Sequence, residues 1–375
     1  MPDQTDHPEM AYEGLEQGPI RPPSEAHSLL LRLTRNCPWN HCTFCPVYKG
    51  TRFSVRPVAQ VQRDIDAVYE AVQRLEQGAG EAQPGGDRQA RVAARNWIKN
   101  GRRQVFLQDA NSLVMPPEDL LAILRHLKAR FPDVTRVTSY ARSNSVAALD
   151  IQTLAALRQA GLSRIHIGME SGADQVLKLV RKGTTKRMHI LAGQKVKAAG
   201  MELSEYYMPG LGGRALLELH ATETASALSR INPDFIRLRT LAIPPEAPLY
   251  ADYLAGRFLK PTDIMMAREL LLFLESLTGV TSAIKSDHIL NLLPEVDGKL
   301  PHDQERLVTI VRTFLDLDPE LQMLYRVGRR TGVMAGLRDL EDPDRLAHVE
   351  DICRHYRIRP ETLDAVTDEM MRRFI

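Results

Sequence analysis

The stretch SLLLRLTRNCPWNHCTFC, residues 28–45, decides the fold, because an apolar run leads directly into three cysteines. The run at residues 28–34 has the length and composition of a buried strand. Cys37, Cys42 and Cys45 follow within nine residues, whereas the fourth cysteine, Cys353, lies far along the chain. Clustering of this kind indicates a bound metal, since disulfide frameworks spread an even number of cysteines along a secreted chain.

Working outward from this stretch, apolar runs alternate with helical patterns. The expected strands lie at residues 28–34, 104–108, 134–139, 164–168, 202–208 and 235–241. Apolar residues at steps of three and four follow them, most clearly after Pro57 with Val58, Val61 and Ile65. Six such β-α units predict an α/β fold with parallel strands and right-handed crossovers. The spacing fits a barrel, open or closed, as well as a doubly wound sheet.

The same patterns divide the chain into three regions. Residues 1–26 read as a flexible arm, residues 27–250 as the strand-bearing core, and residues 251–375 as helical. The helices expected in the last region lie at about 262–277, 303–315, 343–356 and 360–374. The polar, glycine-rich residues 77–90 read as a loop inserted into the core.

Composition excludes several classes of protein. Hydrophobic residues make up 43% and charged residues 26%, as in an ordinary soluble domain. The net charge of +2 does not indicate a nucleic-acid partner. No run approaches the roughly 18 apolar residues of a membrane span, and the acidic start lacks the order of a secretory signal. We therefore expect a cytoplasmic protein without a membrane partner.

The cysteine cluster itself admits three interpretations. Three thiolates in one loop hold three irons of a four-iron cluster and leave the fourth iron open to another ligand. A zinc site would add His41, although adjacent ligands at positions 41 and 42 point in divergent directions. In the third interpretation the cysteines are merely small buried hydrophobic residues.

These residues resemble the cluster loop of the radical S-adenosylmethionine (SAM) superfamily, in particular its compact, single-cluster members such as the oxygen-independent coproporphyrinogen oxidase type. The usual spacing in that family is three and two residues between the cysteines, whereas this chain has four and two. Phe44 matches the aromatic residue before the third cysteine. The resemblance implies a partial (β/α)6 TIM-like barrel with a C-terminal helical appendage. It also implies a [4Fe–4S] cluster on Cys37, Cys42 and Cys45, with SAM as second cofactor.

Later motifs follow the family's order at successive strand ends. Asp109 and Asn111 stand where the family binds the SAM amino group; the alternative is a plain strand-to-helix turn. Glu170, in GMESG, matches the residue that bonds the ribose hydroxyls; the alternative is an acid capping the following helix. Lys182 matches a cation that pairs with the SAM carboxylate; otherwise Arg181 takes that role, or the lysine is a solvated charge.

Gly210 belongs to YYMPGLGG, residues 206–213, which resembles the glycine motif whose backbone approaches the adenine ring. The remaining substrate cavity is expected to be lined by polar or aromatic residues at strand ends, namely Tyr140, Arg142, Tyr207, Arg237 and Arg239. If Arg237 and Arg239 point inward they favour an anionic group; the alternative is that they face outward or pair with local acids.

The resemblance implies an enzyme that reductively cleaves SAM to a 5′-deoxyadenosyl radical, which abstracts hydrogen from a substrate. A small-molecule substrate is expected, together with a reducing electron donor such as flavodoxin or ferredoxin. Cys353 is expected to be a core thiol, so no second all-cysteine cluster can form within the chain. The alternative function is that of a non-catalytic iron–sulfur or zinc-binding protein that keeps the barrel fold.

Overall fold

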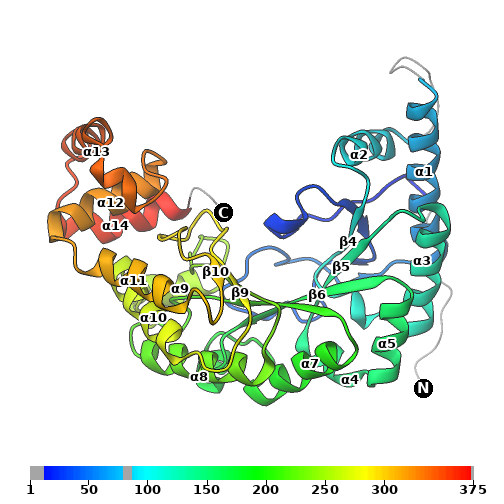
Figure 1. The fold of residues 1–375 in the computed structure, drawn as a ribbon, viewed down its shortest axis with the longest axis horizontal. Helices are drawn as coiled ribbons and strands as arrows, with labels where there is room; N and C mark the ends of the chain where they lie inside the picture. Colours follow the sequence, from blue (N-terminus) through cyan, green and yellow to red (C-terminus); the bar gives the residue numbers. More distant parts are fainter. Residues whose placement is uncertain (1–11, 79–86, 373–375) are drawn as a thin grey trace. The chain divides into compact units, whose positions relative to one another are not determined.

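A mostly parallel sheet organises the protein. The computed structural model describes residues 12–78 and 87–372, and within them eight strands pair in the order β1-β4-β5-β6-β7-β8-β9-β10 (Figure 1). The strands are β1 Leu29–Arg32, β4 Gln104–Gln108, β5 Arg136–Ala141, β6 Leu162–Glu170, β7 Glu202–Tyr207, β8 Phe235–Leu238, β9 Ala283–Lys285 and β10 Gly298–Lys299. The first six are the six strands expected from the sequence, so the α/β class is confirmed.

The chain forms two compact units. The first contains residues 12–38, 52–140 and 155–163, apart from the undescribed 79–86. In it β1, β4 and β5 run parallel, with Leu29 opposite Val105 and Val105 opposite Val137. The short pair β2 Thr34–Arg35 and β3 Ser54–Val55 is antiparallel, and the helices are α1 Val58–Glu76, α2 Arg88–Lys99 and α3 Pro117–Arg130. The predicted apolar stripe of α1 is buried, with Ile65 fully covered.

Helix α2, which begins at Arg88, was not predicted and takes up residues 88–90 at the end of the predicted loop 77–90. The Asp87 carboxylate caps it by accepting from the backbone N–H of Gln89 at 2.8 Å and of Ala90 at 3.1 Å. The buried face of α2 consists of two alanines and Trp97, so few large apolar residues mark it. Part of the expected loop, residues 79–86, lies outside the described residues.

The N-terminal arm makes specific contacts where it is described, and its flexibility stays a prediction. Leu15 is only 2% exposed, and Glu16 pairs with Arg32 at 2.9 Å and with Arg35 at 2.7 Å. The backbone N–H of Gly18 donates to Gln108 Oε1 at 2.9 Å. Charge pairs and hydrogen bonds hold this segment, so a search for apolar patterns misses it. Residues 1–11 lie outside the described part.

The second unit contains residues 39–51, 141–154 and 164–372. In it β6, β7, β8 and β9 run parallel and β10 is antiparallel to β9. Its helices are α4 Ser143–Ala148, α6 Asp174–Leu179, α7 Lys186–Ala198, α8 Leu217–Ile231, α9 Leu249–Leu254, α10 Asp263–Ser276, α11 Gln304–Leu315, α12 Pro319–Thr331, α13 Pro343–His355 and α14 Pro360–Arg372 (Figure 1). Helices α10, α11, α13 and α14 confirm the four expected after residue 250.

Strands β9 and β10 and helix α12 were not predicted in the region expected to be helical. Strands β9 and β10 have only three and two residues, which is too short for a periodic signal. Helix α12 buries Arg326 and Arg330 against Asp263, at 3.0 Å and 2.8 Å, so its inner face reads as charged rather than apolar. The sheet therefore continues past residue 250, and the exact division between core and tail stays a prediction.

The two faces of the sheet in the second unit differ in chemistry. On one face Arg237 Nε donates to Ser204 Oγ at 3.2 Å, and the ring centroids of His166 and Tyr206 lie 6.3 Å apart. Alternate residues of β7 point to the opposite face, where Tyr207 meets helices α8 and α10. No helix in the described part of the chain is both long and apolar enough to span a bilayer.

Candidate functional site

Cys42 and Cys45 lie in the second unit, where the backbone of the intervening Thr43 anchors their segment, whereas Cys37 lies at the edge of the first unit. The N–H of Thr43 donates to the carbonyl of Val180 at 3.0 Å, and the carbonyl of Thr43 accepts from Leu249 N–H at 2.8 Å. Cys42 is buried, whereas Cys37 and Cys45 are half-buried. None of the four cysteines, all of which are described, forms a disulfide. The three thiols of this segment are therefore not oxidised to disulfides.

The donor set fits an iron–sulfur cluster better than zinc. The imidazole of His41 is exposed and packs edge-on against Trp39, with ring centroids 4.9 Å apart. Within the described residues no three histidine, cysteine, aspartate or glutamate side chains are already grouped as a metal site. Three thiolates without a nearby fourth protein ligand match a four-iron cluster that keeps one iron open.

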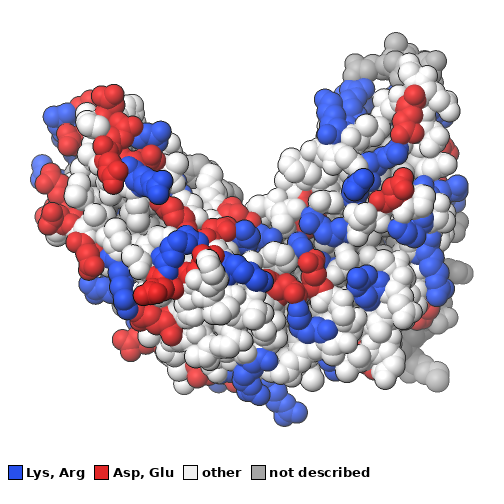
Figure 2. Space-filling model, in the orientation of Figure 1, with Lys and Arg blue, Asp and Glu red and all other residues white. Residues whose placement is uncertain are grey.

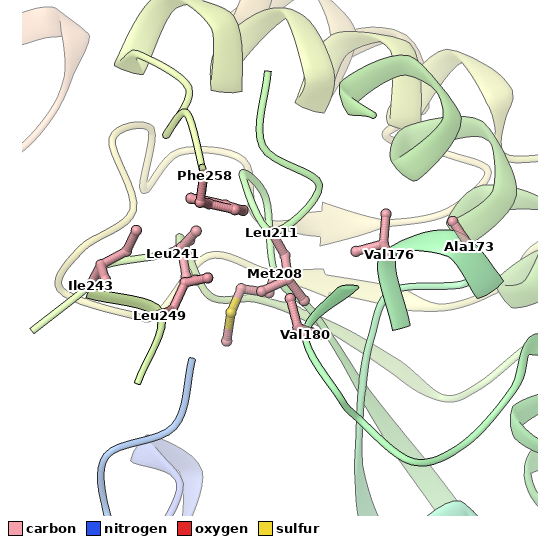
Figure 3. Packing of buried hydrophobic residues seen from close by; sticks show 9 residues of the cluster. All are labelled: Ala173, Val176, Val180, Met208, Leu211, Leu241, Ile243, Leu249 and Phe258. Carbon is pink, nitrogen blue, oxygen red and sulfur yellow. The ribbon is translucent and has the colours of Figure 1, made fainter. Parts of the chain in front are cut away.

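Phe44 packs on an apolar cluster in the second unit. The cluster gathers residues from α6, from the turns after β7 and β8, and from α9 and its exit: Ala173, Val176, Val180, Met208, Leu211, Leu241, Ile243, Leu249 and Phe258. Figure 3 shows Met208 at the centre, with Val180 and Leu249 beside it. This cluster gives the cysteine segment an apolar support.

Glu170, at the end of β6, is the most constrained of the predicted site residues. Its φ of 65° lies in the left-handed region, which costs a non-glycine residue about 1–3 kcal/mol. Its carbonyl accepts from Met208 N–H and from His220 Nε2, each at 3.1 Å. Its Oε1 lies 3.2 Å from Lys182 Nζ, while its Oε2 is buried with no hydrogen-bond partner among the described residues.

The surroundings of Glu170 exclude the helix-capping alternative. Helix α6 begins at Asp174 after Ala173, and the Ala173 N–H donates to Ser171 Oγ at 3.0 Å. A Cβ at Gly168 would lie 2.3 Å from Glu170 Oε1, so only glycine leaves room for this carboxylate. The chain therefore brings a buried acid to the end of β6 without using it as a cap.

Lys182 lies against two other predicted site residues. Its ammonium pairs with Glu170 and sits 5.6 Å from the ring centroid of Phe44. Its side chain is 12% exposed, so it is not a solvated charge. Arg181, the alternative, has a left-handed φ of 52° and its carbonyl accepts from Trp39 Nε1 at 2.8 Å.

The backbone N–H of Gly210 is bonded to a buried carboxylate that was not predicted from the sequence. Its φ is 92°, and its N–H donates to Glu269 Oε2 at 2.9 Å. Glu269 Oε1 accepts from Tyr207 OH at 2.7 Å and lies 2.7 Å from His220 Nδ1. Burial and the Glu269 charge raise the pKa of Tyr207 well above its usual value. Glu269 and His220 thus connect Gly210 with the carbonyl of Glu170.

Asp109 and Asn111 lie in the first unit and are both buried. Asp109 Oδ2 accepts from Arg32 Nη2 at 2.8 Å. A Cβ at Gly18 would come within 3.0 Å of the Asp109 carboxylate, so the arm passes directly over it. Asn111 precedes the short 3-10 helix Ser112–Val114, whose first residues it does not cap with its side chain.

The structure places the expected substrate-lining residues in different environments. Tyr207 is fully buried against α8 and α10, which corrects its prediction as a cavity residue. Arg237 is buried and pairs with Asp287, as the alternative of a local acid anticipated. Arg239 is exposed just after β8. Arg142 lies with its guanidinium 5.3 Å from the Trp39 ring centroid, and Tyr140 packs edge-on against Phe106.

A buried glutamate on β7 was also missed. Glu205 is fully covered, and neither carboxylate oxygen has a hydrogen-bond partner within the described residues. Burial raises its pKa well above the usual value, and the negative charge of Glu170 adds to this effect. A glutamate inside a predicted strand was the available signal. Alternation places it on the helix-facing side of the sheet, with Leu203 and Tyr207.

A family model and a curated relative each match part of the chain. The family model that matches residues 31–222 is that of the Radical SAM superfamily. A curated relative, 4'-phospho-dehydrooxetanocin synthase of Priestia megaterium, is 28% identical over 191 residues, which cover 47% of this chain and 22% of that protein. The chain thus matches less than a quarter of the relative's length.

Solved structures similar to the chain have low sequence identity to it. Coproporphyrinogen III oxidase (HemN) from Escherichia coli is 16% identical, with a TM-score of 0.45 over 66% of this chain and 52% of that chain. Methylornithine synthase (PylB) is 14% identical, with a TM-score of 0.44 over 75% of this chain and 68% of that chain.

Proposed function

The chain belongs to the radical SAM superfamily, and from this premise we propose that it abstracts hydrogen from a small-molecule substrate. It is an enzyme whose cofactors are a [4Fe–4S] cluster and SAM. When bound and reduced, these cofactors would supply a 5′-deoxyadenosyl radical, a species that amino-acid side chains alone cannot generate. Cys37, Cys42 and Cys45 would hold the cluster.

The observation that carries the proposal is the state of Glu170. A buried carboxylate oxygen without a partner is costly, and a ligand hydroxyl would satisfy it. A carboxylate accepts readily from the two vicinal hydroxyls of a ribose. The adjacent Lys182 balances the charge of Glu170, and the Phe44 ring lies beside the same ammonium. These three residues would form one wall of the SAM site.

The other predicted roles stay part of the proposal. Asp109 and Asn111 are the candidates for the SAM amino group, and Lys182 for its carboxylate. Because the N–H of Gly210 is already bonded to Glu269, adenine would meet the carbonyl or Cα of this glycine. An external reductant such as flavodoxin or ferredoxin would supply the electron.

A small-molecule substrate fits the surface chemistry. Both Lys and Arg side chains and Asp and Glu side chains are exposed on the face shown in Figure 2. A surface for nucleic acid would instead gather basic residues on one face. The substrate itself is proposed only at this level of chemistry.

The experiment is anaerobic reconstitution with iron and sulfide, reduction with dithionite, and measurement of 5′-deoxyadenosine formed from SAM. Wild-type protein should be brown and form this product slowly even without substrate. Cys37→Ala, Cys42→Ala and Cys45→Ala should form none. Glu170→Gln should keep the cluster but bind SAM at least about tenfold more weakly, as expected for loss of a charge-assisted hydrogen bond.

Glu246→Gln is the matched control, since Glu246 is exposed and lies in the same unit. A brown protein that binds SAM but never cleaves it would favour the non-catalytic alternative. A colourless protein that contains zinc would overturn the proposal. Equal SAM affinity in Glu170→Gln and Glu246→Gln would remove the ribose role while leaving the cluster chemistry in place.

A further inference from the structure

The turn at residues 181–183 is held by side chains at three consecutive carbonyls. The carbonyl of Arg181 accepts from Trp39 Nε1 at 2.8 Å, and that of Lys182 accepts from Arg142 Nη2 at 2.7 Å. The carbonyl of Gly183 accepts from Asn144 Nδ2 at 3.2 Å. A turn with two left-handed residues needs such support, because its backbone cannot form the bonds of a regular helix.

The indole of Trp39 packs directly on this turn. A Cβ at Gly183 would lie 2.2 Å from Trp39 Cζ2, and Gly183 has a φ of 70°, so both space and backbone require glycine. The Arg142 guanidinium lies 5.3 Å from the indole centroid, within the range of a cation–π contact. Trp39, Arg142 and Gly183 therefore form one packed unit, which we call the Trp39 clamp.

The Trp39 clamp joins the cysteine segment to the proposed SAM site. Trp39 is one of the four residues between Cys37 and Cys42, the spacing that exceeds the family's usual three. At the other end of the clamp, the turn presents the Lys182 ammonium to Glu170 at 3.2 Å. One side chain in the longer spacer thus contacts the turn that carries the cofactor-facing lysine.

We propose that Trp39 is a positioning residue: it docks the four-residue spacer onto the turn at 181–183 and so fixes the cysteine segment and the Lys182–Glu170 pair together. This inference rests on the proposed function, since it assigns the clamp to the cluster and SAM sites.

The test compares Trp39→Leu, which loses the ring and the donor, with Trp39→Phe, which keeps a ring but loses Nε1–H. Three readouts do not require turnover: iron and sulfide per chain after reconstitution, the change in the electron paramagnetic resonance spectrum of the reduced cluster on adding SAM, and the SAM Kd at equal iron content. Trp97→Phe is the control, because Trp97 is the second tryptophan of the chain and is buried in the first unit.

We expect Trp39→Phe to weaken SAM binding about fivefold, the effect of about one hydrogen bond, and Trp39→Leu to weaken it at least about tenfold. Loss of iron from Trp39→Leu but not from Trp97→Phe also supports the proposal. A Kd within twofold of wild type in both Trp39 variants, with normal iron content and spectrum, overturns it. If Trp39→Leu fails to fold, the SAM Kd of Trp39→Phe alone tests the proposal.

Gly183→Ala provides a second arm with a closely matched control. Gly256 has a φ of 69°, nearly that of Gly183, but a Cβ there meets nothing within 4 Å. Gly256→Ala therefore introduces the backbone strain without displacing a ring. The clamp requires Gly183→Ala to lower SAM affinity and Gly256→Ala to leave it unchanged; equal effects contradict it.

Failure of this inference is distinguishable from failure of the proposed function. Glu170→Gln is measured in parallel by the same SAM titration. If Glu170→Gln weakens binding and the Trp39 variants do not, only the clamp is wrong. If Glu170→Gln binds SAM like wild type, the assignment of the site itself fails, whatever the Trp39 variants show.

Discussion

Replacing Glu269 with leucine should destabilise the protein more than any surface substitution on the same helix. Glu269 is fully buried, and its carboxylate faces the Tyr207 hydroxyl, the Gly210 N–H and the His220 ring. Leucine has similar volume but accepts no hydrogen bond. The substitution therefore leaves two buried donors, the Tyr207 hydroxyl and the Gly210 N–H, without their acceptor.

The structure gives the size of this effect. Each of the two buried donors that loses its partner costs about 1–3 kcal/mol. These groups are neighbours, and a single rearrangement of the surrounding structure relieves them together, so their free-energy costs do not add fully. We expect Glu269→Leu to lower the free energy of unfolding by about 3–5 kcal/mol, against a usual total of about 5–15 kcal/mol.

The assay is equilibrium unfolding in urea, followed by far-ultraviolet circular dichroism. Glu275→Leu is the matched control, because Glu275 lies on the same helix but pairs with Arg312 at the surface, where such pairs contribute about 0–1 kcal/mol. The reasoning is refuted if Glu269→Leu stays within 1 kcal/mol of Glu275→Leu. Glu269→Gln, which keeps one acceptor oxygen, should fall between the two.

Three further predictions follow from other buried groups. Burial, with the charge of Arg239, lowers the pKa of His288 to about 4 in the folded protein. Between about pH 6.5 and pH 4 the unfolded chain therefore binds one more proton than the folded chain, and the free energy of unfolding falls as the pH drops. His288→Gln should remove up to about 3 kcal/mol of this fall, and identical pH dependence in wild type and variant would contradict the prediction. Asp287→Asn should lower the free energy of unfolding by about 1–3 kcal/mol because Arg237 is buried, and unchanged urea midpoints would count against it. Cys353→Ala should leave iron per chain unchanged, because this thiol is buried in α13; lower iron would make it a ligand.

The sequence predicted those elements whose apolar residues recur at a fixed step. Helix α1 is such an element, since Val61, Ile65 and Val68 recur on one face and are all buried. Elements held by charge escaped prediction. Helix α12 buries two arginines on Asp263, and the described part of the N-terminal arm is held through Glu16. Apolar periodicity carries no signal for a face that is buried through ion pairs.

Some residues of the candidate site were predicted from the sequence, and others were not. Glu170 and Lys182 are twelve residues apart in the sequence, and the structure brings them into an ion pair. Glu269 and His220 were not foreseen, because helices α10 and α8 bring them to Gly210 and Glu170 from distant parts of the chain. Trp39 was visible in the sequence, but its partner, the turn at Gly183, was not. Side-chain partners across long loops depend on tertiary packing, which a single sequence does not encode in any local pattern.

The bond between Gly210 and Glu269 also bears on how the protein is made. The two residues are 59 positions apart. At a synthesis rate of about 5–20 residues per second, the ribosome reaches Glu269 some 3–12 seconds after Gly210. During that interval the nascent chain already contains all three clustered cysteines, while the glycine turn still lacks its buried carboxylate. Cluster insertion before helix α10 leaves the ribosome would therefore meet a glycine turn that still lacks its buried acceptor.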